Sequence, residues 1–127
     1  MTELRWNSDF KSSIDLDRPV LAVAFKGLFD ASGAATSALE WLSSYFSFMK
    51  LGEIDPETFF DFTQERPTVL FGENGERELR WPANEINAIK TPEGQRDLVV
   101  IAGVEPHLRW KTFSTALTEV AHEVQAE

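Results

Sequence analysis

Two uninterrupted runs of apolar residues, 20–25 and 98–102, give the chain its clearest pattern. A run of this length without polar alternation is typical of a β-strand covered on both faces, as in a parallel sheet. Each run is followed by a glycine and then by an acidic residue, Asp30 or Glu105, shortly before a predicted helix. Ligands of open parallel sheets bind beyond the carboxyl ends of the strands. We therefore expect Asp30 and Glu105 to lie near each other and near any functional site.

Two longer segments carry the periodicity of amphipathic helices. After Asp30, apolar residues recur at spacings of three and four up to about Phe48. They form two neighbouring stripes, and a face this wide predicts cover by more than one element or by another chain. The final helix is expected from about Arg109 to Val124, with a buried stripe made of Phe113, Leu117, Val120 and Val124.

Shorter elements fill the middle of the chain. We predict a short strand over 51–55, a hairpin formed by 68–71 and 77–81, and a short helix or strand over 84–90. The order is then strand, helix, strand, hairpin, strand, helix. This is an α/β layout with one parallel pair of strands and an added hairpin.

The hairpin is predicted from an Asn74-Gly75 pair between its two strands. Asn-Gly favours a two-residue turn, which would place Leu70 opposite Leu79 and Thr68 opposite Trp81. The same turn would set two acidic residues, at positions 73 and 76, against each other. A longer loop is therefore the alternative.

Residues 1–18 are polar with scattered apolar positions, and we interpret them as an extended lead-in to one α/β domain over 19–127. Few strands are predicted in that domain. A sheet this small leaves an open edge or an uncovered face. We expect the chain either to form part of a longer polypeptide or to complete itself by association.

Composition narrows the classes of partner. The chain has 127 residues and a net charge of −9, and 43% of its residues are hydrophobic, enough for the core of one domain. An acidic surface disfavours nucleic acid and anionic lipid and suits a basic protein surface. The absence of cysteine excludes disulfides and thiolate chemistry. We find no signal-peptide pattern and no apolar run of membrane-spanning length, and we predict a cytoplasmic protein.

The loop after the first strand offers one candidate ligand site, with Lys26, Gly27, Asp30 and Gly33 in the pattern Lys-Gly-x-x-Asp-x-x-Gly. Its glycines permit close backbone approach, and Asp30 can either contact a ligand or cap the helix that follows. The loop lacks the glycine pattern of a phosphate loop, and a carboxylate at a helix start repels phosphate.

The loop after the last strand adds Glu105 and Arg109 to this candidate site. Glu105 can serve as a general acid or base with Arg109 binding an anion, or the two can form a local ion pair four residues apart. Together, Asp30 and Glu105 would make the one acid–base pair in the sequence. His107 and His122 do not have metal-ligand spacing. We predict no metal, no cofactor and no confident catalytic residue.

Aromatic side chains supply the second candidate surface. Phe59, Phe60, Phe62 and Trp81 form either an exposed patch for a partner or the core beneath the hairpin. Aromatic residues dominate the binding energy of protein interfaces. The wide helix face favours association, and the complete candidate interface consists of Trp41, Tyr45, Phe48, Phe59, Phe60, Phe62, Trp81 and Trp110.

Several local sequences, in this order and spacing, resemble one family over residues 18 to about 124. They are Arg18-Pro19-Val20-Leu21, the run from Phe25 to Thr36, Glu53-Ile54-Asp55-Pro56-Glu57, Asp61-Phe62, Arg66-Pro67, Trp81-Pro82 and the run from Gly103 to Trp110. The chain resembles the proteasome-assembly-chaperone family of the second-subunit type, in its bacterial, actinobacterial-type branch. Members are usually longer, with more strands after the last helix seen here, so the chain looks like their N-terminal half. The family's Asp-Ala-Gly reads Asp30-Ala31-Ser32-Gly33 here, which shifts the glycine by one position.

The resemblance implies a three-layer α/β/α sandwich similar to nucleoside phosphorylases, with a mostly parallel sheet and an added hairpin, here possibly incomplete. It also implies a cytoplasmic, self-associating protein whose eukaryotic relatives assemble the proteasome core ring. Our first hypothesis is a non-catalytic interaction module that binds protein partners, including proteasome core subunits. The alternative is a small-molecule-binding protein or enzyme with its polar site at the ends of the parallel strands.

Overall fold

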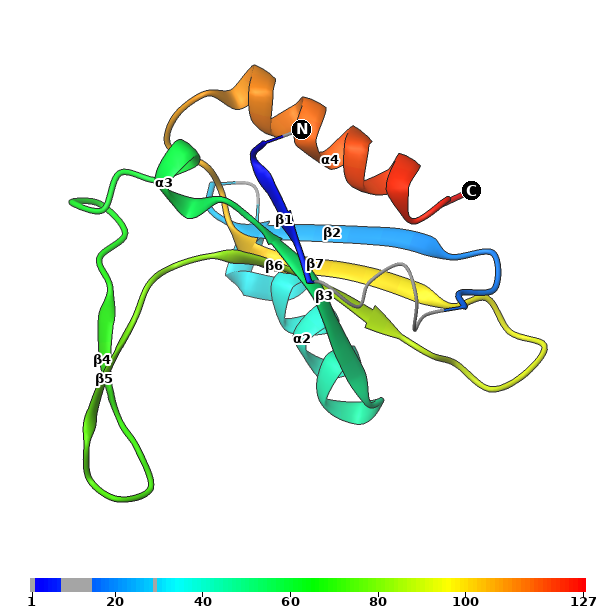
Figure 1. The fold of residues 1–127 in the computed structure, drawn as a ribbon, viewed down its shortest axis with the longest axis horizontal. Coiled ribbons are helices and arrows are strands. Elements are labelled where there is room, and N and C mark those ends of the chain that lie inside the picture. The colour runs from blue at the N-terminus through cyan, green and yellow to red at the C-terminus, as the bar shows by residue number, and fades with distance from the viewer. Residues whose placement is uncertain (1, 8–14, 29) are drawn as a thin grey trace.

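A five-stranded mixed sheet forms the centre of the computed structural model, which describes residues 2–7, 15–28 and 30–127 (Figure 1). The strands lie side by side in the order β1, β3, β6, β7, β2. Their bounds are β1 (Leu4–Trp6), β2 (Val20–Lys26), β3 (Phe48–Ile54), β6 (Asn84–Ile89) and β7 (Leu98–Val104). The segment 84–90, for which helix and strand were alternatives, is therefore a strand. The chain has a mixed α/β fold.

The predicted pairing of the two apolar strands is confirmed, because β2 and β7 run parallel with Val20 opposite Leu98. The expectation of a mostly parallel sheet is wrong, since the β1–β3, β3–β6 and β6–β7 pairs are antiparallel. The short connection over 90–97 explains the β6–β7 case. A parallel pair needs a crossover of a dozen residues or more, and a short loop returns the chain antiparallel.

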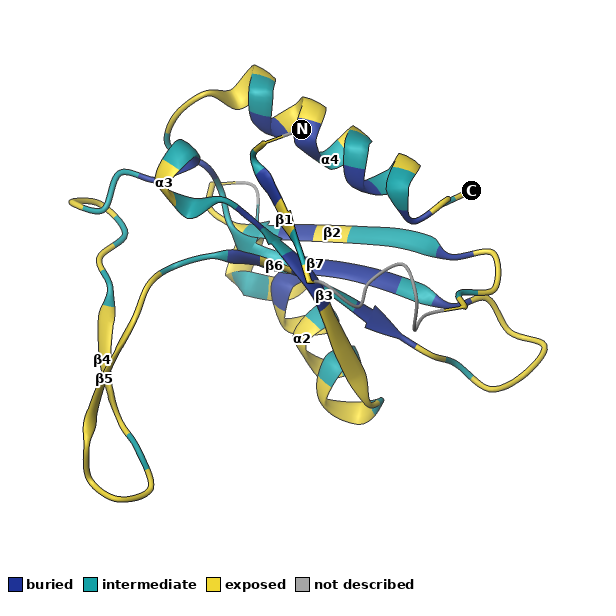
Figure 2. Cartoon of the chain, viewed as in Figure 1, coloured by how far each residue is buried: buried dark blue, intermediate teal, exposed yellow. Residues whose placement is uncertain are grey.

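The main core lies between one face of this sheet and the C-terminal helix α4 (Trp110–Glu123), as Figure 2 shows. The predicted stripe of α4 is confirmed, with Phe113 and Val120 at the centre of the core and Val124 at its end. Short α3 (Pro56–Phe59) contributes Phe59, which packs edge-on against Phe113 at 5.2 Å between ring centroids. Apolar burial of this kind is the main stabilising contribution to the fold.

Helix α2 (Ala34–Tyr45) follows a single 3₁₀ turn, η1 (Ala31–Gly33), and contacts β2 and β7 on the side away from α4 (Figure 1). It ends three residues before the predicted Phe48, because Phe46 is already extended and Phe48 begins the β3 ladder opposite Ile89. Thr36 is its one buried residue. The wide apolar face predicted for this helix therefore exists, but most of it is uncovered in the described chain.

The hairpin forms an arm that projects from the body of the molecule (Figure 1). It consists of β4 (Thr68–Phe71) and β5 (Arg77–Arg80), and every residue of both strands is exposed. The two-residue turn is wrong: Leu70 lies opposite Glu78, and Phe71 opposite Arg77. The longer loop that was the alternative separates the two glutamates, and the Gly72 N–H closes it by donating to the carbonyl of Glu76 at 2.8 Å.

The start of β6 is joined to the end of β7 through a side chain. Asn84 is buried, and its amide donates to the Val104 carbonyl at 3.0 Å and accepts from the Val104 N–H at 2.8 Å. The side chain thus replaces a backbone pair where the two strands diverge. Gly103 makes room for it, since a Cβ at that position would collide with the Asn84 Oδ1.

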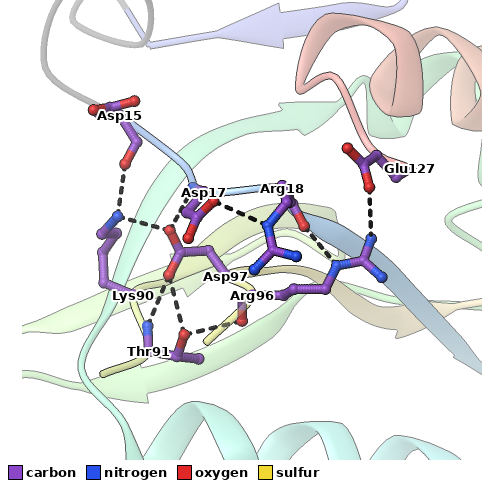
Figure 3. Close-up of polar contacts among 8 residues, drawn as sticks. All are labelled: Asp15, Asp17, Arg18, Lys90, Thr91, Arg96, Asp97 and Glu127. Carbon is purple, nitrogen blue, oxygen red and sulfur yellow. Dashed lines mark hydrogen bonds and ion pairs between the residues drawn. The ribbon is translucent and has the colours of Figure 1, made fainter. Parts of the chain in front are cut away.

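A buried carboxylate joins two segments at the amino end of the β2–β7 pair, as Figure 3 shows. Asp97 accepts from the Lys90 ammonium at 2.6 Å, from the Asp17 N–H at 2.8 Å and from the Thr91 N–H at 2.9 Å. Close by, Arg96 donates to the carbonyl of Arg18 at 2.9 Å. This cluster holds the part of the lead-in just before β2 against the 90–97 loop.

The rest of the lead-in is described only in part. β1 pairs antiparallel with β3, and Leu4 is buried in the core. Residues 8–14, which belong to the predicted lead-in, lie outside the described residues.

Candidate functional site

The loops that follow β2 and β7 meet at one end of the sheet. The Glu105 N–H donates to the carbonyl of Lys26 at 3.0 Å, directly after the last paired residues of the two strands. The Glu105 side chain lies against Gly27, where a Cβ would overlap its carboxyl group. The structure therefore brings together the ends of β2 and β7 in the way the apolar runs predict.

Asp30 caps helix α2. Its carboxylate accepts from the Ala35 N–H at 2.9 Å and from the Thr36 hydroxyl at 2.6 Å. The Thr36 hydrogen bond lowers the pKa of the Asp30 carboxyl, and the backbone N–H groups and Lys26 act in the same direction against the opposing effect of desolvation. The helix itself begins after Gly33, which adopts the left-handed conformation with φ +69°. Both oxygens of Asp30 are thus engaged in holding the helix start.

Glu105 differs from Asp30, because its half-buried carboxylate has no hydrogen bond or ion pair with the described residues. The alternative of a local pair with Arg109 is not formed, since the chain between them is not helical and Arg109 adopts a left-handed conformation with φ +57° at the start of α4. Nearby, Lys26 forms an exposed ion pair with Glu40 at 3.6 Å. This strand-end site therefore holds one unpartnered carboxylate and one paired lysine.

His107 has a structural role next to this site. The imidazole Nδ1 accepts from the Asp61 backbone N–H at 2.9 Å, and the His107 backbone N–H donates to the Phe59 carbonyl at 2.9 Å. The hydroxyl and N–H of Thr63 lower the pKa of the Asp61 carboxyl. These bonds fix the segment after α3 against the loop that leads to α4.

The predicted aromatic interface divides between core and surface. Phe59 and Phe60 are buried, at 1% and 4% exposure, and offer no contact area to a partner. Phe62 is half-buried and packs edge-on against Trp81 at 5.0 Å between ring centroids. Trp81 and Trp110 remain about half exposed, at 52% and 51%.

Exposed residues cover much of α2 and the start of β3 (Figure 2), and several of them are large and apolar. Trp41 and Tyr45 stack on each other at 5.1 Å and are both exposed. Phe48 and Met49 follow at the first positions of β3 and are exposed as well. Neighbouring strand residues point to opposite faces of a sheet, so we call only the stacked pair Trp41 and Tyr45 the α2 surface.

The arm carries a second apolar surface that the sequence interpretation missed. Val69 pairs with Leu79, and alternation along β4 places Phe71 on the same side of the ribbon, nearer the tip. Trp81 follows directly after β5, at the root of the arm. All four side chains are more than half exposed. The alternation of apolar and polar residues in both strands is the signal for this face, which we call the arm surface.

Among residues 2–7, 15–28 and 30–127, no group of three or more His, Asp or Glu side chains is placed to hold a metal ion. In the same part of the chain, no helix is long and apolar enough to cross a membrane.

Comparison with known proteins identifies relatives of this fold. The model of the PAC2 family matches residues 24–127. A PAC2 family protein from Streptomyces avermitilis is 34% identical, with a TM-score of 0.80 over 86% of this chain and 46% of its own. A proteasome-assembly chaperone homologue from Mycobacterium tuberculosis is 35% identical, with a TM-score of 0.75 and the same coverage.

A protein of unknown function from Corynebacterium glutamicum shares the fold at 20% identity, with a TM-score of 0.82 over all of this chain and 48% of its own. No curated protein matches. The chain spans about half the length of each of these three solved relatives.

Proposed function

The chain belongs to the PAC2 family, and on that premise we propose that it is a protein-interaction module of the assembly-chaperone kind, without catalytic activity of its own. The observation that carries the proposal is the exposure of two apolar surfaces, the α2 surface and the arm surface, on a chain with net charge −9. Exposed apolar patches rimmed by polar residues mark sites of protein association.

We propose that its partners are proteasome core subunits, that it also self-associates, and that it acts in the cytoplasm. A solved relative at 35% identity is a proteasome-assembly chaperone homologue, which supports the choice of partner. The acidic chain suits a partner with a basic face, because complementary charge accelerates encounter and suppresses wrong partners. We also propose the three-layer sandwich that the resemblance implies. In this arrangement an associating molecule covers the exposed side of α2.

The experiment is native mass spectrometry of the purified chain mixed with purified actinobacterial proteasome core subunits. We expect a complex of fixed stoichiometry, together with a self-associated form of the chain alone. The double variants Trp41→Ala/Tyr45→Ala and Phe71→Ser/Leu79→Ser should each weaken the complex at least tenfold, because central aromatic contacts carry most of the energy of an interface.

The matched control is Leu108→Ala, which removes an apolar side chain of similar exposure outside both surfaces. It should leave the complex unchanged, and all the variants should keep the wild-type unfolding temperature. Absence of any complex with the core subunits, or equal weakening by Leu108→Ala, would overturn the proposal.

The second candidate function is small-molecule binding or catalysis at Lys26, Gly27, Asp30, Gly33, Glu105 and Arg109. The observation that favours it is the unpartnered carboxylate of Glu105 beside Gly27. The double variant Asp30→Asn/Glu105→Gln separates the two functions. It should leave the subunit complex intact if the chain is an interaction module, whereas under the alternative it abolishes a reproducible small-molecule adduct of the wild-type chain.

A further inference from the structure

A groove at the root of the arm is lined by neither the α2 surface nor Glu105, and shares only Trp81 with the arm surface. Its volume is about 410 Å³, which is within the range of small-molecule sites. Its floor is formed by β6 and β7, including Asn87 and Ala102, and its wall by the start and end of the arm. The small side chain of Ala102 leaves the floor hollow. The wall presents polar side chains, among them Arg66, Thr68 and Arg80.

Neither arginine of the wall has a carboxylate partner among the residues that the structure describes. In this acidic chain, six of the described basic side chains form ion pairs: Arg5, Arg18, Lys26, Lys50, Lys90 and Arg96. Arg66 and Arg80 form neither ion pairs nor side-chain hydrogen bonds with the described residues. Guanidinium groups are suited to bidentate recognition of carboxylates. Two of them beside one groove thus form an anion-binding wall.

Two acidic residues of the groove limit the charge of the anion. Glu85 lies 3.5 Å from the Lys50 ammonium, which also pairs with Glu53 at 3.4 Å and therefore offsets only part of the Glu85 charge. Glu65 also lines the groove, without such a pair. The two guanidinium groups are opposed by Glu65 and by the part of the Glu85 charge that Lys50 does not offset, so the local charge is at most about +1 at neutral pH. This balance favours a monoanion over a phosphate dianion.

Two other residues that line the groove indicate which further groups a ligand would carry. Trp81 lines the groove with 52% of its surface exposed, which offers a ring face for stacking. On the floor, the Asn87 side-chain oxygen is buried and has no hydrogen-bond partner in the described part of the chain. A buried polar group without a partner is rare in native proteins and calls for a physical explanation. A ligand that brings a polar group to the floor would supply the missing interaction when the amide reorients.

We propose that this groove binds a small organic monoanion carrying a planar ring, with Arg66 and Arg80 on its carboxylate and Trp81 against its ring. The proposal goes beyond the interaction role. It uses neither the α2 surface nor Glu105, and its test needs only the chain and the ligand, so the result does not depend on whether the subunit complex forms. Trp81 is shared with the arm surface, and occupation of the groove would therefore alter the face that this residue presents.

The test is a titration of the ¹⁵N-labelled chain with 2-naphthoate, followed by the NMR signals of the Trp81 indole N–H and the arginine Nε–H groups. We expect saturable shifts at Trp81, Arg66 and Arg80. The neutral analogue 2-naphthol and the ringless anion acetate should each bind at least tenfold more weakly, because each lacks one of the two interactions.

Three variants keep the test specific. Arg66→Gln/Arg80→Gln should weaken 2-naphthoate at least tenfold, and Ala102→Leu should do so by filling the floor while both arginines remain. Arg77→Gln is the matched control: Arg77 is an exposed, unpaired arginine on the same arm that does not line the groove. It should change the affinity less than twofold.

Since both groove arginines are exposed and unpaired, their loss should leave the unfolding temperature unchanged. Lack of saturable shifts, tight binding of acetate or 2-naphthol, or equal weakening by Arg77→Gln would each overturn the proposal.

Discussion

The cluster around Asp97 makes a quantitative prediction about stability and pH. The carboxylate is 1% exposed and accepts hydrogen bonds from Lys90, Asp17 and Thr91. Asp97→Asn keeps the size of the side chain but removes its charge, and places an amide N–H among groups that are themselves donors. Leaving such buried donors unsatisfied lowers the free energy of unfolding by about 2–3 kcal/mol at pH 7.

The pH dependence follows from the same contacts. Burial alone would raise the pKa of the Asp97 carboxyl, but the bonds from Lys90, Asp17 and Thr91 outweigh it and lower the pKa from 3.8 to about 2. A carboxyl with a lower pKa in the folded state stabilises the fold above its ordinary pKa, and this contribution is lost as the pH falls through the folded value. At about 1.4 kcal/mol per unit, the contribution is about 2 kcal/mol, of which about 1 kcal/mol is lost by pH 3.

The assay is urea unfolding followed by circular dichroism at pH 7, 5 and 3. The difference in unfolding free energy between wild type and Asp97→Asn should be constant from pH 7 to pH 5 and about 1 kcal/mol smaller at pH 3. Glu93→Gln is the control, because Glu93 lies on the same loop and is exposed. It should match the wild type throughout. If wild type and Asp97→Asn lose stability in parallel down to pH 3, the argument from the buried carboxylate is refuted.

Three further predictions concern local packing, and thermal unfolding measures each. Gly103→Ala forces a Cβ onto the Asn84 oxygen and should cost about 2 kcal/mol; an unchanged unfolding temperature would contradict the described divergence of β6 and β7. Thr36→Val removes the hydroxyl bonded to Asp30 and should cost about 1 kcal/mol, with reduced helical circular dichroism, whereas full helicity would argue against this cap. Phe113→Ala opens a cavity between α4 and the sheet and should cost about 3–5 kcal/mol, and a loss below 1 kcal/mol would place the core elsewhere.

The elements that the sequence predicts well are those whose pattern is set by burial. β2, β7 and α4 were placed within a few residues because their apolar spacing reflects direct contact with the core. The end of α2 was placed too late, because Phe48 fits the helical stripe and the β3 ladder equally and tertiary pairing decides between them. The register of the arm depended on the conformation of a five-residue loop, which the Asn-Gly signal does not specify.

The candidate site, too, could be predicted from the sequence only in part. Adjacency of the β2 and β7 loops follows from parallel pairing, and the cap role of Asp30 was one of two readings of its position. The groove at the arm root could not be predicted, because Arg66 and Arg80 of the arm line it together with Ala102 of β7. This contact depends on how the arm is placed against the sheet, on which local sequence holds no information.

The parallel pairing of β2 with β7 has a consequence for the synthesis of the chain. Val20 pairs with Leu98, so β2 leaves the ribosome 78 positions ahead of its partner. Until β7 emerges, the six consecutive apolar residues of β2 have neither a neighbouring strand nor the cover of α4. Pairings of such long sequence separation form late, and an unpaired apolar strand is prone to aggregate. The interval between the synthesis of these two strands is therefore when the nascent chain most needs protection, and translation stalled within it leaves the most aggregation-prone product.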